Sequence, residues 1–157
     1  MNGMENQRFE PDRALTRGML VTTLYRLAGS PEVTEKATFA DLRAGAYYTD
    51  AVAWAQDLGI AKGMTETQFA PEKTVSREQA ATFLYRFVTL YLEQEPGKGA
   101  DLSVFKDGNV MNYAKTAMSW AVAEGFFEGY GDGTLRPTTS LTRAQMAKLL
   151  TILDQNF

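Results

Sequence analysis

The sequence predicts an all-α fold built from helix–loop–helix units that recur along the chain. Three copies of one pattern support this: in each, a Pro follows a Gly by 8 residues and an Arg follows that Pro by 6. The three Arg residues are Arg17, Arg77 and Arg143, and they lie 60 and then 66 residues apart. Spacing kept this closely indicates an internal repeat, so the 157 residues are expected to form a short repeat array.

The first copy, residues 1–31, matches only the second half of the other two. Thr16 is expected to cap a helix that ends at Gly29, with an inward apolar face of Leu20, Leu24 and Leu27. Because the leading half of this copy is missing, we expect that face to lack a partner. Another chain, a swapped copy or upstream sequence would then cover it.

The second and third copies, residues 39–92 and 105–157, are complete. A helix is expected from Tyr47 to Leu58, a loop to Pro71 and a second helix after Ser76. The landmarks of this copy recur 66 residues later: Phe39/Phe105, Asp41/Asp107, Tyr47/Tyr113, Ala51/Ala117, Trp54/Trp120 and Gly59/Gly125. One hairpin of about 50 residues buries too little surface to be stable alone, so the units should pack on each other around a pseudo-threefold axis.

The helices that carry the three Arg residues begin with capping signals. Ser76 with Gln79, and Thr142 with Gln145, form capping boxes, whereas Met19 breaks the box that Thr16 would start. An Arg at the first helical position faces the positive end of the helix dipole, which costs about 0.3–1 kcal/mol. Two interpretations remain open. Each Arg pairs with an acid of a neighbouring repeat, such as Asp41 or Asp107, or it joins free N–H groups in binding an external anion.

Composition excludes several function classes. The chain has no His and no Cys, so Ser-His-Asp and Cys-His catalysis and zinc sites built on those residues are absent. A net charge of −3 provides no general field for nucleic acid. No run of about 18 apolar residues predicts a membrane span. No leader opens the chain, so any secretion signal lies outside it or is absent.

The Gly-rich segment 129–133 invites two further comparisons. Asp132-Gly133 lacks the other carboxylates of a calcium loop, so a tight turn is expected there. The three alternating Gly residues are not followed by the Lys and hydroxyl residue of a phosphate-binding loop. We therefore expect no metal, no cofactor and no catalytic activity. Trp54 and Trp120 are expected to pack in the core.

These motifs resemble the S-layer homology (SLH) domain. The resemblance rests on Phe-x-Asp, an aromatic residue, Ala-Val/Met-x-Trp, Gly-Tyr-x-Asp-Gly-Thr-Leu-x-Pro and Leu-Thr-Arg-Ala-Gln, and it covers essentially the whole chain. It implies a pseudo-threefold all-α assembly, with grooves between repeats, that anchors exported proteins to the bacterial cell envelope. The usual ligand would be a secondary cell-wall polysaccharide carrying pyruvyl ketals, and some members bind peptidoglycan.

The resemblance also implies a set of ligand-binding residues. The Arg of the family's Thr-Arg-Ala-Glu motif corresponds to Arg17, Arg77 and Arg143, its Trp to Tyr47 and Tyr113, and its nearby Asp to Asp41 and Asp107. This sequence departs from the family at the motif's Glu, which is Met19, Gln79 and Gln145 here, and in having Tyr for Trp. From the caps we expect Arg77 and Arg143 to bind acidic sugar beside Tyr47 and Tyr113, and Arg17 to matter less.

Two functions are consistent with this sequence. The first is a non-catalytic anchoring module of the bacterial cell envelope, located outside the cytoplasm, that binds an acidic, pyruvylated cell-wall glycan. The second is a degenerate array of the same type that mediates protein–protein assembly at the cell surface. The three Arg residues favour the first function, and the missing Glu and Trp favour the second.

Overall fold

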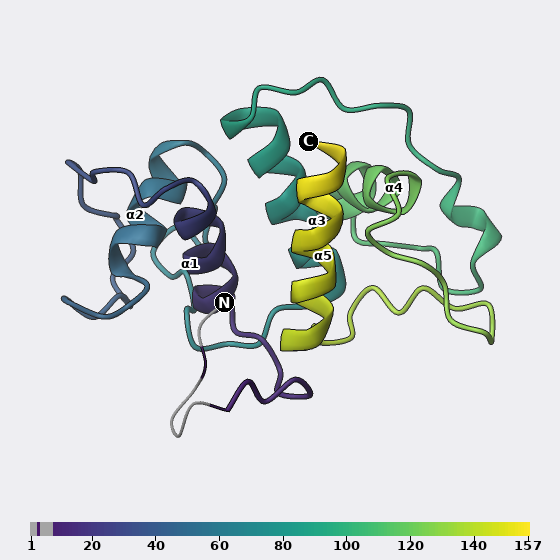
Figure 1. The fold of residues 1–157 in the computed structure, drawn as a ribbon, viewed down its shortest axis with the longest axis horizontal. Coiled ribbons are helices and arrows are strands. Elements are labelled where there is room, and N and C mark those ends of the chain that lie inside the picture. Colours follow the sequence, from purple (N-terminus) through teal and green to yellow (C-terminus); the bar gives the residue numbers. More distant parts are fainter. Residues whose placement is uncertain (1–2, 4–7) are drawn as a thin grey trace.

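The computed structural model describes residue 3 and residues 8–157 of the chain, and this part is helical (Figure 1). Its five α-helices are α1 (Arg17–Leu27), α2 (Thr49–Asp57), α3 (Arg77–Arg86), α4 (Lys115–Ala123) and α5 (Arg143–Asn156). A π-helical turn, Phe87–Tyr91, extends α3, and short 3₁₀ turns lie at Leu102–Val104 and Asn112–Ala114. The described residues form isolated bridges but no strand, so the all-α prediction is confirmed.

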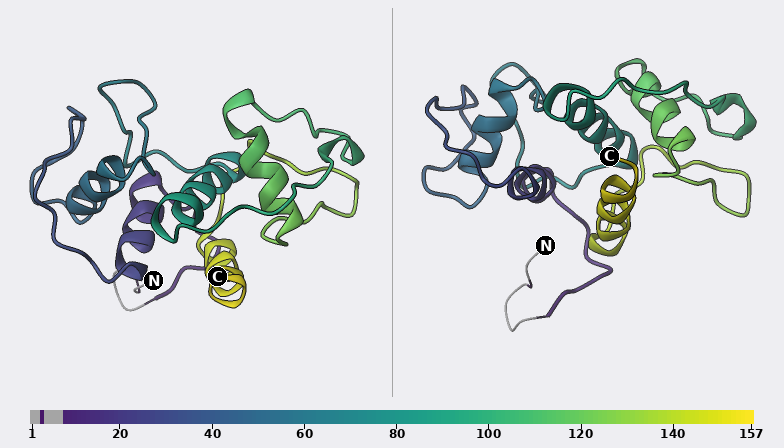
Figure 2. Two further views of the ribbon diagram at one scale, coloured as in Figure 1. Left: turned by 90° about the horizontal axis from the view of Figure 1, so that it is seen from above. Right: turned by 45° about the horizontal axis from the view of Figure 1, so that its top comes forward.

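The three Arg-bearing helices lie together, and the other two flank them. α1, α3 and α5 occupy the middle of the molecule, with α2 outside α1 and α4 outside α3 (Figures 1 and 2). The closely packed helix pairs are α1 with α2 and α3 with α4. The leading helix of each complete repeat therefore packs on the second helix of the repeat before it.

This packing corrects the expectation for the first copy. Leu20 and Leu24 of α1 are fully buried, and only Leu27, at the end of the helix, is 51% exposed. The expectation that their face lacks a partner was wrong, because α2 of the following repeat packs on α1. By the same rule, a leading helix of the first repeat would pack on α5. The corresponding α5 surface includes Lys148 and Thr151, which are polar and exposed.

The two Trp residues anchor the flanking helices in the core, as expected. Trp54 of α2 lies 5.6 Å from the ring of Tyr25 on α1, and Trp120 of α4 lies 5.5 Å from the ring of Tyr85 on α3. Both are buried, at 7% and 2% exposure. Aromatic pairs at these distances add about 0.5–1.5 kcal/mol to the burial of the rings. The same contact thus fastens each flanking helix to the preceding repeat.

A closed ring of backbone hydrogen bonds joins the three repeats at the centre. The N–H of Leu15 donates to Leu141 O (2.8 Å), that of Val75 to Leu15 O (2.9 Å) and that of Leu141 to Val75 O (2.9 Å). The three side chains are fully buried. Each residue directly precedes the cap of an Arg-bearing helix, so the ring places α1, α3 and α5 in equivalent positions.

The starts of these helices are satisfied from within the molecule. In α1, the N–H of Arg17 donates to Lys73 O and that of Gly18 to Pro71 O. The equivalent donors of α3 bind Thr139 O and Pro137 O, and those of α5 bind Arg13 O and Pro11 O. The cap hydroxyls of Thr16, Ser76 and Thr142 accept the third N–H, and both predicted capping boxes are present. The premise that these N–H groups are free for an anion was therefore wrong.

Gly63 begins the loop that returns the chain to the second Arg-bearing helix. A Cβ at Gly63 would collide with Thr65 O and would lie 2.6 Å from both Gln68 O and the ring of Phe39. By contrast, nothing lies within 4 Å of a Cβ at Gly131, in the corresponding loop of the third repeat. The two Gly residues are therefore suitable as a test position and its control for substitution by Ala.

Gly63→Ala should lower the free energy of unfolding by about 1–3 kcal/mol or more, because backbone atoms must move to admit the methyl group. Gly131→Ala should leave it unchanged within about 0.5 kcal/mol. Urea denaturation of both variants measures the difference. Equal stability of the two would contradict the packing of the Gly63 loop.

Candidate functional site

Each Arg side chain extends out of its own repeat and contacts the next repeat in the cycle. The contact is with the loop that leads to the Arg-bearing helix of that repeat, which we call the return loop. The Nε of Arg17 donates to Phe69 O (2.8 Å), and the Nε of Arg77 donates to Leu135 O (3.1 Å). Arg143 closes the cycle, because its Nε donates to Phe9 O (2.8 Å) in the first repeat. All three residues are buried, at 3%, 6% and 4% exposure. The Arg residues therefore tie each loop to the repeat that precedes it in the cycle.

Aromatic rings cover the guanidinium groups. The Arg17 guanidinium carbon lies 4.7 Å from the ring centre of Phe69 and 5.2 Å from that of Phe83. Arg77 lies similarly over Phe127 (4.5 Å) and Tyr130 (5.1 Å). Burial lowers the pKa of Arg17 to about 10, so its side chain remains charged at neutral pH. Cation–π attraction partly compensates the desolvation of these charges.

Asp41 and Asp107 hold the same loops from within their own repeats. Asp41 accepts from the N–H of Phe69 (2.9 Å) and Ala70 (2.7 Å), and Asp107 accepts from those of Leu135 (2.6 Å) and Arg136 (2.9 Å). These carboxylates bind backbone N–H groups, whereas Arg17 and Arg77 bind carbonyls. For these two Arg residues the interpretation of a pair with a neighbouring Asp was therefore wrong.

The second N–H in each Asp contact belongs to a residue with an unusual backbone. Ala70 (φ 58°) and Arg136 (φ 55°) are left-handed, as is Glu10 (φ 48°) in the first copy, and each precedes the Pro of its loop. A non-Gly residue in this region carries strain. The Asp carboxylates offset that strain by fixing the N–H groups of Ala70 and Arg136.

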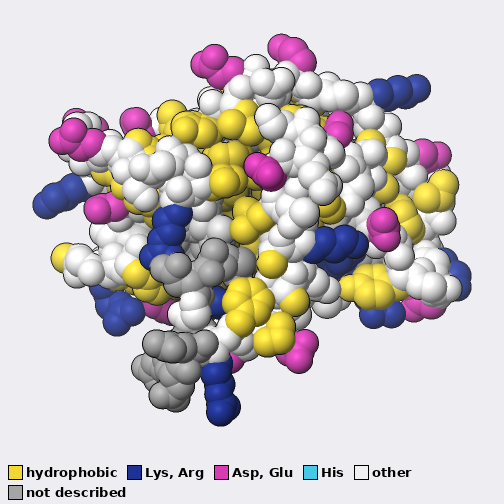
Figure 3. All heavy atoms as spheres, in the orientation of Figure 1, with side chains coloured by type: hydrophobic (Ala, Val, Ile, Leu, Met, Phe, Trp, Pro, Cys, Tyr) yellow, Lys and Arg dark blue, Asp and Glu magenta, His cyan; other side chains and the backbone are white. Residues whose placement is uncertain are grey.

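A groove lies between the second return loop and the helices around it. This first groove encloses about 340 Å³ and is lined by Arg17, Lys62, Gly63, Met64, Gln79, Thr82, Phe83, Arg86 and Tyr113. The lining therefore combines residues from all three repeats. It contains three cationic side chains and no carboxylate, although the chain as a whole carries a net charge of −3. On the face seen in Figure 3, basic and acidic side chains are intermixed.

Tyr113 brings an aromatic ring from the third repeat to the first groove. It is 52% exposed, and its hydroxyl lies 3.5 Å from Oε1 of Glu78. Glu78 is buried and also accepts from the N–H of Met111 (3.4 Å). Desolvation, reinforced by Glu78, raises the pKa of Tyr113 to about 12, so the phenol is neutral at physiological pH. Glu78 thus links α3 to the segment that presents this ring.

A second groove lies at the equivalent place in the third repeat but lacks several of these groups. It encloses about 200 Å³ and is lined by Arg77, Phe126, Phe127, Glu128, Gly129, Tyr130, Gln145, Lys148 and Leu149. Glu128 takes the place of Lys62, and no residue of its lining corresponds to Tyr113. The two grooves therefore share a frame but differ in size, charge and aromatic content.

The remaining predicted residues lie elsewhere. Tyr47 is 50% exposed and packs edge-on against Tyr48, 5.1 Å between ring centres, and it lines neither groove. The segment equivalent to Lys62–Met64 in the first copy falls on residues 2–4, which lie mostly outside the described residues, so the surroundings of Arg143 are described only in part. Asp41 and Asp107 also line neither groove.

Comparison with known proteins identifies the family to which these repeats belong. The family model of the S-layer homology domain matches residues 38–81 and 105–147. The chain belongs to the S-layer homology family. The prediction made from the repeat motifs is confirmed, including its association with the bacterial cell envelope.

Relatives of the chain include a surface-layer protein and an anchoring protein. The chain is 31% identical, over 99% of its length, to a surface-layer 125 kDa protein of Lysinibacillus sphaericus, of which the match covers 13%. It is 25% identical over 96% to a cellulosome-anchoring protein of Acetivibrio thermocellus (34% covered), and 29% identical over 98% to an endoglucanase of a Bacillus species (16% covered). The chain thus spans about a third or less of these relatives.

Two further features are absent from the part of the chain that the structure describes. None of the helices there is both long and apolar enough to cross a membrane. The same residues contain no cluster of three or more acidic side chains that could hold a metal ion.

Sequence reasoning missed three residues around the first groove: Lys62, Glu78 and Arg86. Arg86 shares one helical face with Gln79 and Phe83, but a basic residue in the last turn of a helix is a weak functional signal. Lys62 gave no signal, since a Lys beside a loop Gly is usual on a surface. Glu78 was hidden because the equivalent positions in the other SLH copies hold Gly18 and Ala144.

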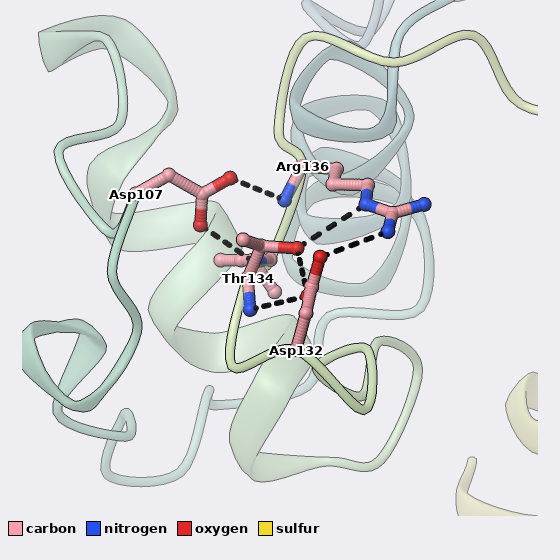
Figure 4. A network of polar contacts seen from close by, with 5 residues as sticks. Asp107, Asp132, Thr134 and Arg136 are labelled. Atoms are coloured by element: carbon pink, nitrogen blue, oxygen red, sulfur yellow. Dashed lines mark hydrogen bonds and ion pairs between the residues drawn. The ribbon is translucent and has the colours of Figure 1, made fainter.

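The Asp132 turn forms the polar network of the third return loop (Figure 4). Oδ1 of Asp132 accepts from the N–H (3.0 Å) and the hydroxyl (2.6 Å) of Thr134, and Oδ2 pairs with Arg136 (3.1 Å). The left-handed Gly133 confirms the predicted tight turn. The hydrogen bond from the Thr134 hydroxyl is the largest cause that lowers the pKa of Asp132, to about 2. The N–H of Leu135 likewise lowers the pKa of Asp107.

Replacing Arg77 tests the tie between repeats. Arg77→Ala should lower the free energy of unfolding by about 2–4 kcal/mol, because it removes hydrogen bonds to two carbonyls and the contacts with two rings. Arg77→Lys should recover only part of this loss, since an ammonium lacks the fork of donors. Arg26→Ala, at an exposed residue, is the control. Denaturant unfolding in which Arg77→Ala and Arg26→Ala behave alike would refute the tie.

The Asp132 turn predicts a pH dependence of stability. A carboxyl whose pKa is lower in the folded state stabilises that state when ionised, so its contribution is complete above about pH 4 and disappears as pH falls toward 2. The parent protein should lose thermal stability over this range. Asp132→Asn should be less stable at pH 7 and should show a shallower decline below pH 4, as measured by circular dichroism melting. Parallel curves would exclude this contribution.

Proposed function

We propose that the chain is a non-catalytic anchoring module that binds an acidic, pyruvylated cell-wall polysaccharide in its first groove. The observation that carries this proposal is the concentration of Arg17, Lys62 and Arg86 around one cavity, with the exposed ring of Tyr113 at the same site. The names of the relatives, a surface-layer protein and a cellulosome-anchoring protein, support attachment to the cell surface. In the endoglucanase the match covers only 16% of the protein, which is consistent with a role beside catalysis.

The groove has the chemistry that such a ligand requires. Its volume of about 340 Å³ falls in the usual range of small-molecule sites. Three cations suit a ligand carboxylate, and the amide NH2 of Gln79 supplies a donor for hydroxyl groups. Tyr113 offers an apolar face for a sugar ring, and its neutral phenol does not repel an acidic group. A pyruvylated sugar combines all of these features.

The other predicted ligand-binding residues take secondary roles in this proposal. Arg77 would bind more weakly, because the second groove is smaller, contains Glu128 and lacks an aromatic equivalent of Tyr113. Asp41 and Asp107 would act through the loops that they hold. Arg143 and Tyr47 would belong to a third groove that includes the start of the chain. The groove that ranks first is thus the one that contains Arg17, the Arg ranked last from the caps.

The alternative function, protein–protein assembly at the cell surface, requires a different surface. It would have to use exposed apolar side chains such as Leu27 and Leu90, which lie outside the first groove. The charged groove instead favours the glycan. A binding experiment that compares glycan and stripped glycan discriminates the two functions.

Tyr113 provides a test that leaves the Arg ties between repeats intact. Isothermal titration with purified pyruvylated cell-wall glycan should show binding by the parent, and Tyr113→Ala should weaken it about 3- to 10-fold through loss of the ring. Tyr113→Phe should retain most of the affinity.

The control ligand is the same glycan after mild acid has removed its ketals. The parent should bind this material much more weakly. Equal affinity for both glycans, or retention of the protein on cell walls stripped of polysaccharide, would refute the proposed ligand and favour assembly with a protein.

A further inference from the structure

Arg86 differs from Arg17 in that its guanidinium makes only one hydrogen bond with the described residues. The inference drawn from this difference rests on the proposed function. It lies at the end of α3, is half-buried and donates to the carbonyl of Ile60 at 3.3 Å. Burial lowers its pKa. A partly desolvated guanidinium held by one long hydrogen bond retains donors for another acceptor.

Arg17 is committed to the structure by comparison. Its Nε donates to Phe69 O at 2.8 Å, one terminal nitrogen lies 3.5 Å from Lys62 O, and the group is held against two Phe rings. At 3% exposure it offers little surface to a ligand. Its charge therefore contributes to the field of the groove, while its hydrogen bonds hold the groove wall.

No acidic side chain neutralises Arg86 within the described part of the chain. The three ion pairs found there join Arg13, Arg43 and Arg136 to other residues. Glu78 contacts Tyr113, a residue of the groove lining, but its carboxylate accepts from Met111 N–H and lies beside the Tyr113 hydroxyl. Arg86, Arg17 and Lys62 thus share one cavity without a carboxylate in its lining, and a ligand anion would relieve their mutual repulsion.

The equivalent positions show that the scaffold does not require an Arg here. Arg86 corresponds to Arg26 of α1, which is exposed, and to Ile152 of α5, which is half-buried. In contrast, all three copies keep the Arg that ties the loops together. Since an apolar residue fills the same place on α5, folding alone does not explain a half-buried cation at the end of α3.

We propose that Arg86 forms the direct ion pair with the carboxylate of the bound glycan, and that it gives the first groove its preference for acidic over neutral sugar. The planar guanidinium suits a bidentate contact with that carboxylate. Arg17 then acts as a positioning residue, because its hydrogen bonds hold the loop that supplies Lys62 and Gly63 to the groove.

The experiment compares Arg86→Gln, Arg86→Lys and Arg26→Gln in the whole chain. Each is titrated calorimetrically with pyruvylated cell-wall glycan and with the same glycan freed of ketals, and thermal melting verifies folding. Arg86→Gln should bind the pyruvylated glycan roughly 10- to 150-fold more weakly and should discriminate little between the two glycans. Arg86→Lys should give an intermediate affinity. Arg26→Gln removes the same charge from the equivalent helix position and should stay within about threefold of the parent.

Three outcomes would overturn the inference. They are parent-like affinity of folded Arg86→Gln, an equal loss in Arg26→Gln, and undiminished preference for the acidic glycan in Arg86→Gln. If Arg86→Gln does not fold, parent-like binding by Arg86→Lys would overturn the bidentate contact. A parent that binds both glycans equally would refute the proposed function itself, so the two failures are distinguishable.

Discussion

The structure depends on how one residue in each of the second and third return loops is held. The N–H of Phe69 is bound by Asp41 of the same repeat, and its carbonyl is bound by Arg17 of the first repeat. Leu135 is held in the same way by Asp107 and Arg77. Because the donor and acceptor of one peptide segment are satisfied by different repeats, a loop reaches its final conformation only when its neighbour is in place. Folding of the described repeats is therefore expected to be cooperative.

The same interaction explains an Arg at an unfavourable helix position. The helix dipole disfavours a cation at the first turn. Here, however, the first N–H groups are saturated by loop carbonyls, and the Arg side chain donates to carbonyls of that same loop. Each return loop thus presents several acceptors to one helix start. The Arg supplies donors that the backbone alone cannot, and this structural gain offsets the dipole cost.

The repeat pattern predicted the helices well, because spacing, caps and apolar periodicity are local properties. It did not predict that α2 covers α1, since a repeat shows which residues are equivalent but not which neighbour each unit contacts. For the same reason the sequence did not predict that Arg17 and Tyr113, which belong to the first and third repeats, line one groove. Arg86 was missed for another reason. A basic residue in the last turn of a helix is usual because it complements the dipole, so it carries little functional signal.

The three copies have the same residue where an Arg joins one repeat to the next, and they have different residues where the grooves are lined. Arg17, Arg77 and Arg143 are identical because each donates to a carbonyl of the next loop, and neither Ala nor Lys supplies the same fork of donors. Residues on the groove side face no such requirement, and the position of Arg86 holds Ile152 in another copy. The contacts that join the three repeats can therefore stay the same while the residues that line the grooves differ. Binding would then be concentrated where all three repeats contribute, which in the described residues is the first groove.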